Sequence, residues 1–262
     1  MRARDYPFFQ PRFIPMAHRG GWVDERDAPR ENTLGAFRRA HDLGYTYMET
    51  DVHLTRDGVL VAFHDESLER LTGRPGTISD ITLAELNGDR TDPSDRVPTM
   101  DELLEALPKA RFNIDMKADS TVAPLWDVIS AHACQDRVCV ASFSARRLGR
   151  FRRLAGPGVA TSTGQAEVVW HVVPLLPHYV QGAGVALQVP VARRVAGRMI
   201  TVVTPRLVAN AHARGLVVQV WTIDEADEMD RLITMGVDGL ITNRIDVLRA
   251  VLERRGLWQA LG

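Results

Sequence analysis

The sequence predicts an α/β fold of the (β/α)8 or TIM barrel type, with a small insertion at about residues 65–96. Strand-like and helix-like segments alternate along nearly the whole chain, which is typical of parallel strands joined by helical crossovers. The length of 262 residues suits one barrel domain, and no linker or second core divides residues 1–262. An open doubly wound sheet is the alternative, but the chain lacks the glycine-rich phosphate loop of that fold.

Short apolar or alternating runs predict the strands. Most are apolar throughout, as expected where both faces of a parallel sheet are buried. Residues 59–63 follow a turn at 56–58, so they form either a hairpin with the preceding strand or an extension of it. If residues 59–63 are counted together with the strand at 45–53, the nine runs give eight strands, the number that closes a barrel. The runs are 13–17, 45–53, 59–63, 111–116, 138–141, 159–161, 185–189, 217–221 and 239–242.

Helical apolar spacing occurs between most of these strands. Asn32 or Thr33 can cap the first helix. Glycines end three helices, at Gly44, Gly215 and Gly236. Residues 165–179 are ambiguous because two prolines interrupt their helical character. The expected helices are 34–43, 83–86, 99–107, 121–133, 145–154, 205–214, 225–235 and 245–254.

The charge and cysteine content exclude several classes of protein. The chain has 32 lysines and arginines against 33 aspartates and glutamates, a formal charge of −1. No whole-chain field therefore favours nucleic acid or an anionic membrane. Cys134 and Cys139 lack the spacing of a zinc site or a redox motif, so we expect ordinary thiols of a reduced compartment.

Two segments bear on localisation. Residues 1–15 contain three prolines and no apolar core segment, unlike a signal peptide. Residues 168–192 lack charged side chains, but prolines, glycines and histidines interrupt them, unlike a membrane span. We expect a cytoplasmic protein without stable membrane insertion. The sequence does not specify an oligomeric state.

Charged, histidine and tryptophan side chains follow the expected strands at their carboxyl ends, where the active sites of barrels lie. They are His18, Glu49, Asp51, His64, Asp115, Lys117 and Trp221. Glu49 and Asp51 share one face of a strand, and so do Asp115 and Lys117, because residues at i and i+2 point the same way. Buried carboxylates are costly without a partner, so a metal ion or a catalytic site is the usual reason for such a pair.

Each of these residues also has an ordinary structural explanation. Glu49 and Asp51 could form a structural ion pair with Arg19, and Lys117 could simply neutralise Asp115. His18 could be a hydrogen-bonded structural residue, and Trp221 could pack in the core. Taken together, the residues favour a functional site, since all of them fall at one edge of the expected barrel.

These residues stand in motifs that resemble the glycerophosphodiester phosphodiesterase family. The resemblance runs from His18 to about Leu252 and is weak only over 164–182. The ordered combination of motifs is highly specific. The motifs are Ala17-His18-Arg19-Gly20-Gly21, Glu31-Asn32-Thr33, Glu49-Thr50-Asp51-Val52, Asp57-Gly58, His64-Asp65, Val220-Trp221-Thr222 and the run from Gly236 to Arg244.

The resemblance implies a distorted TIM barrel and a divalent cation, Mg²⁺ or Ca²⁺, held by carboxylates. Glu49, Asp51 and Asp115 match the metal ligands. The family commonly has glutamate where Asp115 stands, so this carboxylate is one methylene shorter. Its contact with the metal could therefore pass through a water molecule, or the metal preference could shift. Oxygen-only ligation agrees with Mg²⁺ or Ca²⁺ rather than zinc.

The resemblance also implies the catalytic and substrate-binding residues. His18 and His64 match the general acid-base pair, and Arg19 matches a phosphate contact. Lys117 and Trp221 are expected to bind substrate beside them. One histidine would deprotonate either water or the neighbouring glycerol hydroxyl, while the other protonates the leaving alkoxide. Which histidine takes which role is left open.

The implied reaction is hydrolysis of a small glycerophosphodiester to glycerol 3-phosphate and an alcohol. The alternative enzyme is a lysophospholipase D acting on lysophospholipids, for which apolar residues could form a lip around the acyl chain. Those residues are Trp22, Trp170, Leu175, Leu176 and Tyr179. A barrel that only binds phosphorylated ligands is a further alternative. It is disfavoured because both histidines and both Glu49 and Asp51 are present.

Overall fold

The computed structural model describes residues 1–88, 90, 92–164, 184–195 and 197–258. Eight parallel strands form a nearly closed barrel in the order β6-β5-β4-β2-β1-β11-β10-β7, which confirms the predicted fold class. A parallel bridge between Ser162 and Ala186 joins the two edges. The eight strands are β1 (Ile14–Trp22), β2 (Tyr47–Leu54), β4 (Arg111–Met116), β5 (Val138–Ala141), β6 (Ala160–Thr161), β7 (Ala186–Pro190), β10 (Val217–Trp221) and β11 (Gly239–Arg244).

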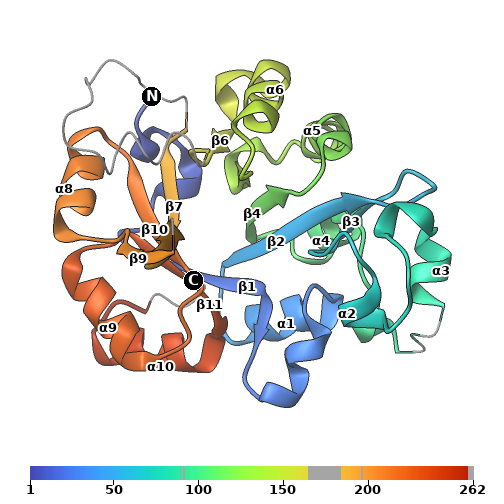
Figure 1. Ribbon diagram of the computed structural model, residues 1–262, viewed down its shortest axis with the longest axis horizontal. Coiled ribbons are helices and arrows are strands. Elements are labelled where there is room, and N and C mark those ends of the chain that lie inside the picture. The colour runs from blue at the N-terminus through green and yellow to red at the C-terminus, as the bar shows by residue number, and fades with distance from the viewer. Residues whose placement is uncertain (89, 91, 165–183, 196, 259–262) are drawn as a thin grey trace.

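Helices surround these strands (Figure 1). Their inward side chains and the outward side chains of the strands form the main apolar core. Threonine or serine hydroxyls cap four helices by accepting a backbone N–H, and the caps are Thr33, Thr99, Ser144 and Thr204. The helices around the barrel are α1 (Leu34–Asp42), α4 (Met100–Ala106), α5 (Val122–Ala131), α6 (Ala145–Ala155), α8 (Pro205–Ala213), α9 (Ala226–Met235) and α10 (Ile245–Arg254).

A second apolar cluster fills the barrel at the amino ends of its strands. Phe8 and Phe9 come from short 3-10 turns before β1, and both are fully buried. The ring of Phe8 packs edge-on against Tyr47, whose hydroxyl donates to the Phe8 carbonyl at 2.6 Å. The N-terminal segment therefore closes this end of the barrel and leaves the carboxyl end for a site.

Strand β3 (Leu60–Ala62) lies outside the barrel and pairs antiparallel with β2. The sequence left a hairpin and an extension open, and the structure shows the hairpin. The expectation that His64 ends a strand of the barrel is therefore wrong. The link between β2 and β3 is too short for a parallel connection, which needs a dozen or more residues.

The expected insertion packs as a small unit beside this hairpin. It contains α2 (Glu69–Thr72) and α3 (Leu83–Asn87), which lie at the opposite edge of the view from α8 (Figure 1). Its own apolar cluster joins side chains of the hairpin to side chains of the insertion. The cluster consists of Val61, Phe63, Leu68, Ile78, Leu86 and Val97. This packing fixes the insertion against the strand that carries Glu49 and Asp51.

A second hairpin follows β7 and was not predicted from the sequence. It consists of β8 (Ala192–Val195) and β9 (Arg198–Thr201), which form a separate two-stranded sheet. The ambiguous residues 165–179 lie outside the described part of the chain. Among the described residues, no helix combines the length and apolar character needed to cross a bilayer.

Candidate active site

Adjacent strands β1, β2 and β4 bring most of the predicted site together. In the sheet register His18 lies beside Glu49, and Asp51 lies beside Asp115. The three carboxylate residues are almost completely buried. Lys117 follows directly after β4, so it projects at the same carboxyl edge. The expectation that residues at i and i+2 share a face is confirmed for both pairs.

The end of β1 has an unusual backbone that places Arg19. Arg19, Gly20 and Gly21 have φ angles of 52°, 85° and 61°, all in the left-handed region. A Cβ on Gly20 would lie 2.7 Å from the Ala36 Cβ of α1. A Cβ on Gly21 would lie 2.6 Å from Ile245 at the start of α10. Two glycines are therefore required for this bend to pack between the helices.

Two cationic side chains neutralise the central carboxylate. Lys117 Nζ lies 2.7 Å from Asp51 Oδ1 and 2.7 Å from Asp115 Oδ2. Arg19 Nε lies 3.1 Å from Asp51 Oδ2. The structural ion pairs that the sequence suggested, of Arg19 with Asp51 and of Lys117 with Asp115, are therefore both present. These pairs sit at the mouth of the barrel, so they also supply positive charge where an anionic ligand would bind.

Burial and neighbouring charges separate the pKa values of the three carboxyl groups. Burial raises the pKa of Asp51, but Lys117 and Arg19 outweigh it and hold the pKa below its usual range. Burial and the adjacent Asp51 charge raise the pKa of Glu49 well above its usual range. Burial also raises the pKa of Asp115, and Lys117 only partly offsets it. The cluster therefore lacks enough positive charge for three ionised carboxylates.

Unpartnered oxygens test whether these residues suit a divalent cation. Glu49 Oε2, Asp51 Oδ2 and Asp115 Oδ1 are buried without a hydrogen bond, although Asp51 Oδ2 keeps its ion-pair contact with Arg19. Three such oxygens suit Mg²⁺ or Ca²⁺ in number and chemical type. Within the described part of the chain, no three acidic, histidine or cysteine side chains are already grouped at metal-binding spacing. The donors fit a cation, and they must move closer together to hold one.

A chain of hydrogen bonds fixes the ring of His18. Its Nδ1 lies 2.6 Å from Asn243 Oδ1, and Asn243 Nδ2 donates to Asp224 Oδ2 at 2.8 Å. The amide oxygen can only accept, so Nδ1 carries the proton of the neutral ring. The Nε2 lone pair then faces Glu49, whose Oε2 is 3.6 Å away. Burial and the nearby Arg19 lower the pKa of His18 to about 4.

His64 lies on the other side of Asp51, after β3. The Phe63 N–H donates to the Asp51 carbonyl at 2.9 Å, which ties this segment to β2. His64 Nδ1 lies 2.5 Å from Asp65 Oδ1, and its carbonyl accepts from His53 Nε2 at 3.1 Å. The His64 side chain remains about one-third exposed, at 32%. It is therefore accessible at the mouth, while His18 is enclosed.

Alternating charges connect His64 to the opposite side of the site. Asp65 Oδ2 lies 2.5 Å from Arg70 Nε, and Arg70 Nη2 lies 2.6 Å from Glu31 Oε1. The same Glu31 oxygen lies 3.0 Å from Arg19 Nη1. This series of ion pairs begins in the insertion, passes through Glu31 in the β1–α1 loop and ends at Arg19, which pairs with Asp51. The insertion thus helps to orient both histidine-bearing segments.

Trp221 ends β10 and packs against an aromatic neighbour. The ring centroids of Trp221 and Phe143 are 5.7 Å apart, at an interplanar angle of 76°. Lys117 Nζ lies 5.6 Å from the centroid of the Phe143 ring. Trp221 also packs against the second apolar cluster, which fills the inside of the barrel, so part of its side chain does belong to the core. The aromatic pair forms a wall beside the cations.

Several residues of the site had no role in the sequence analysis. Glu31, Asp65 and Asn243 stand in the quoted motifs, but their partners are distant in sequence. Asp224 and Phe143 follow the carboxyl ends of β10 and β5, and that position was the available signal. Strand alternation alone does not reveal such contacts, because they join residues of different strands and loops that are far apart in the sequence.

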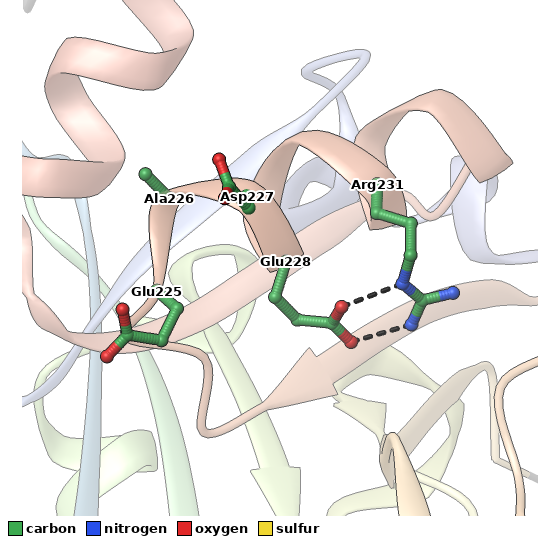
Figure 2. Close-up of a pocket in the computed structure, with 5 residues that line it drawn as sticks. All are labelled: Glu225, Ala226, Asp227, Glu228 and Arg231. Atoms are coloured by element: carbon green, nitrogen blue, oxygen red, sulfur yellow. Dashed lines mark hydrogen bonds and ion pairs between the residues drawn. The ribbon is translucent and has the colours of Figure 1, made fainter.

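A surface hollow lies at the start of α9 (Figure 2). Its lining residues are Glu225, Ala226, Asp227, Glu228 and Arg231. Figure 2 shows Arg231 paired with Glu228, and the closest of their atoms lie 2.6 Å apart. None of the predicted site residues lines this hollow. The candidate site is therefore the cluster at the ends of β1, β2 and β4.

Comparisons with known proteins agree with this geometry. The model of the glycerophosphoryl diester phosphodiesterase family matches residues 18–247. The chain is 39% identical over 249 residues to a probable glycerophosphodiester phosphodiesterase 2 of Mycobacterium tuberculosis, covering 94% of this chain and 92% of that protein. It is 35% identical over 120 residues to human lysophospholipase D GDPD1, covering 41% of this chain and 37% of that protein.

A solved structure shows the same fold. It is a phosphodiesterase of Oleispira antarctica in complex with the product sn-glycerol-3-phosphate. The TM-score is 0.73 at 23% identity, with 92% of this chain and 96% of that chain covered. The fold and the family match define a TIM-barrel hydrolase of phosphoric diesters. The chain belongs to the glycerophosphoryl diester phosphodiesterase family.

Replacing Lys117 tests the charge balance of the site. Lys117→Met should reduce the free energy of unfolding by about 3 kcal/mol at neutral pH, because it leaves buried carboxylates without their cation. The low pKa of Asp51 stabilises the folded state above the unfolded pKa, and that contribution disappears as pH falls. The deficit should therefore persist down to about pH 4 and shrink only as pH falls further. Urea unfolding at several pH values measures it.

Lys109→Met is the matched control, since Lys109 is exposed and lies outside the site. Its unfolding free energy should stay within about 0.5 kcal/mol of the parent protein. An equal loss in both variants, or a deficit for Lys117→Met that is independent of pH, would contradict the assigned role.

Proposed function

We propose that this protein hydrolyses glycerophosphodiesters to glycerol 3-phosphate and an alcohol. The observation that carries the proposal is the meeting of a histidine, three carboxylates and two cations at the ends of β1, β2 and β4. Family membership supports the reaction class. The product bound in the Oleispira antarctica relative supports glycerol 3-phosphate as the product here.

Glu49, Asp51 and Asp115 would hold a divalent cation, Mg²⁺ or Ca²⁺. Each has a buried oxygen that lacks a hydrogen bond, which supports this assignment. When bound, such a cation neutralises charge that develops on the phosphoryl oxygens. The shorter side chain of Asp115 makes this carboxylate the most sensitive to the size of the ion.

Arg19 and Lys117 bind and orient the phosphodiester. Each already contacts Asp51, and each has further donors that can point into the mouth. Glu31 holds the Arg19 guanidinium from behind, which restricts its orientation. Trp221 and Phe143 exclude water on one side of the phosphate and provide an apolar wall.

The two histidines move protons at Nε2. Asn243 keeps the proton of His18 on Nδ1, which leaves a lone pair on Nε2 to accept a proton from the nucleophile. Asp65 binds Nδ1 of His64, so its Nε2 is free to protonate the leaving alkoxide at the exposed edge of the mouth. The hydrogen-bond partners support this division of roles, which the sequence left open.

A lysophospholipase D activity is the second candidate. The partial match to human GDPD1 favours it, and so does the exposed Phe143 beside Lys117. Of the apolar lip expected from the sequence, only Trp22 lies in the described part of the chain, at the end of β1. The other members lie outside it.

We further propose a single catalytic domain over residues 1–262, active in the cytoplasm on small-molecule phosphodiesters rather than nucleic acid. Strands from both ends of the chain pair within the barrel, which supports one domain. Cys134 and Cys139 are free thiols, which suits a reducing compartment.

Activity of metal-stripped protein on glycerophosphocholine tests the reaction. Release of glycerol 3-phosphate should require added Mg²⁺ or Ca²⁺, and His18→Ala should lower kcat by about 100-fold or more. Glu49→Gln, which keeps the shape of the side chain, should also lose activity and regain part of it at high metal concentration. Metal-independent release that survives both changes would refute the proposal. Release from lysophosphatidylcholine alone would favour the second candidate.

Asn243 provides a test of how His18 is held. Asn243→Ala removes the acceptor on Nδ1 and should lower kcat by about 10- to 100-fold with little change in KM. Asn87→Ala is the control, because Asn87 makes comparable amide hydrogen bonds within the insertion. Steady-state kinetics of both variants decide the matter. A rise in KM with unchanged kcat would place Asn243 in substrate binding instead.

A further inference from the structure

Charge is unevenly distributed along the chain although the total is near zero. Residues 138–223 contain ten arginines and one glutamate. The remainder holds 22 of the 32 basic residues and 32 of the 33 acidic residues. Strands β5, β6, β7 and β10 fall in the basic part, and they are consecutive around the barrel (green to orange in Figure 1). This part of the chain therefore carries an excess of positive charge, although Asp119 from outside it pairs with Arg146, Arg147 and Arg150.

The β8–β9 hairpin lies within this basic part. It begins two residues after β7 ends, so it extends from the carboxyl face that carries the candidate site. Arg194 lies opposite Met199 in the register of the hairpin. Arg198, the first residue of β9, is also exposed. The hairpin thus presents arginine and aliphatic side chains together.

Strand β9 of this small sheet is exposed. All four residues of β9 are exposed, including Met199 at 62% and Ile200 at 44%. A two-stranded sheet is marginal in water unless another surface packs against it. Met199 and Ile200 point to opposite faces, because successive residues of a strand alternate. Each face of the sheet therefore exposes one large aliphatic side chain, which indicates a hairpin that becomes covered.

Other exposed apolar side chains gather at the same end of the barrel. Val23 follows β1, and Phe143 follows β5, so both leave the carboxyl ends of their strands. Leu154, which is equally exposed, sits near the end of α6 and hence toward the opposite face. The apolar residues and the arginines of the hairpin therefore lie around the mouth.

We propose that the β8–β9 hairpin binds the surface of an anionic phospholipid bilayer. Arg194 and Arg198 pair with lipid phosphates, while Met199 and Ile200 enter the boundary between head groups and acyl chains. Nucleic acid would satisfy the arginines but would leave the aliphatic side chains in water. The binding is peripheral and reversible, because neither strand can span a bilayer. It directs the mouth of the barrel toward the membrane.

Vesicle co-sedimentation of the full chain tests this proposal without turnover, so its failure would leave the proposed hydrolysis untouched. Vesicles of phosphatidylcholine with about one-third phosphatidylglycerol should bind the protein, and binding should weaken as salt rises. Vesicles of phosphatidylcholine alone should bind at least about tenfold more weakly. Equal binding to both, or binding to neither at low salt, would overturn the proposal.

Paired substitutions separate the two kinds of contact. Arg194→Ala with Arg198→Ala should weaken binding about 25-fold, since each arginine contributes about fivefold near an anionic surface. Met199→Ser with Ile200→Ser should weaken it about tenfold through lost apolar burial. All four positions are exposed, so these variants should fold, and circular dichroism confirms that. Leu154→Ser and Arg38→Glu are the controls, because they change exposed residues away from the mouth.

Each result has one meaning. Loss of vesicle binding in both hairpin variants, with both controls unchanged, supports a lipid surface. Loss in the arginine variant alone would show a site for any polyanion and would overturn the assignment to lipid, as would tighter binding to duplex DNA than to the vesicles. Loss in neither hairpin variant would move the interaction elsewhere on the molecule.

Discussion

Three carboxylates buried on neighbouring strands must be neutralised, and the rest of the site depends on how this is done. Lys117 and Arg19 approach Asp51 from two sides, at 2.7 Å and 3.1 Å. Burial raises the pKa values of Glu49 and Asp115, and two cations do not supply enough positive charge to offset it. A divalent cation would correct the imbalance, and it would do so where a phosphodiester binds. Structural ion pairs and the proposed catalytic site are therefore the same set of contacts.

The surrounding structure holds these charges in place. Arg19 reaches Asp51 only because Gly20 and Gly21 adopt left-handed conformations and pack closely against α1 and α10. Glu31 and Arg70 extend the ion pairs to the insertion, which carries Asp65 beside His64. Asp224 and Asn243 hold His18 from the opposite side. Each reactive side chain is thus fixed by a partner from a different loop, which is how a barrel builds a precise site from separate segments.

The sequence predicted the barrel because its local signals agreed. Helices capped at Thr33 and Thr99 and ended at Gly44 or Gly236 lie within a few residues of the expected bounds. The pairing of Glu49 with Asp51 followed from strand alternation. The contact of Asn243 in β11 with His18 in β1 was not predicted, because no periodicity links residues so far apart in the sequence. The β8–β9 hairpin was missed because its arginines and exposed aliphatic residues do not alternate as in a half-buried strand.

The central claim is that Glu49, Asp51 and Asp115 form one divalent-cation site whose charge Lys117 and Arg19 only partly balance. Calorimetric titration of the metal-free protein with Mg²⁺ and Ca²⁺ tests it most directly, with Glu49→Gln and Asp115→Asn alongside. The prediction is one cation per chain, with affinity at least about tenfold weaker in each variant. Equal affinity in the parent protein and both variants would contradict it, because the cation would then bind elsewhere.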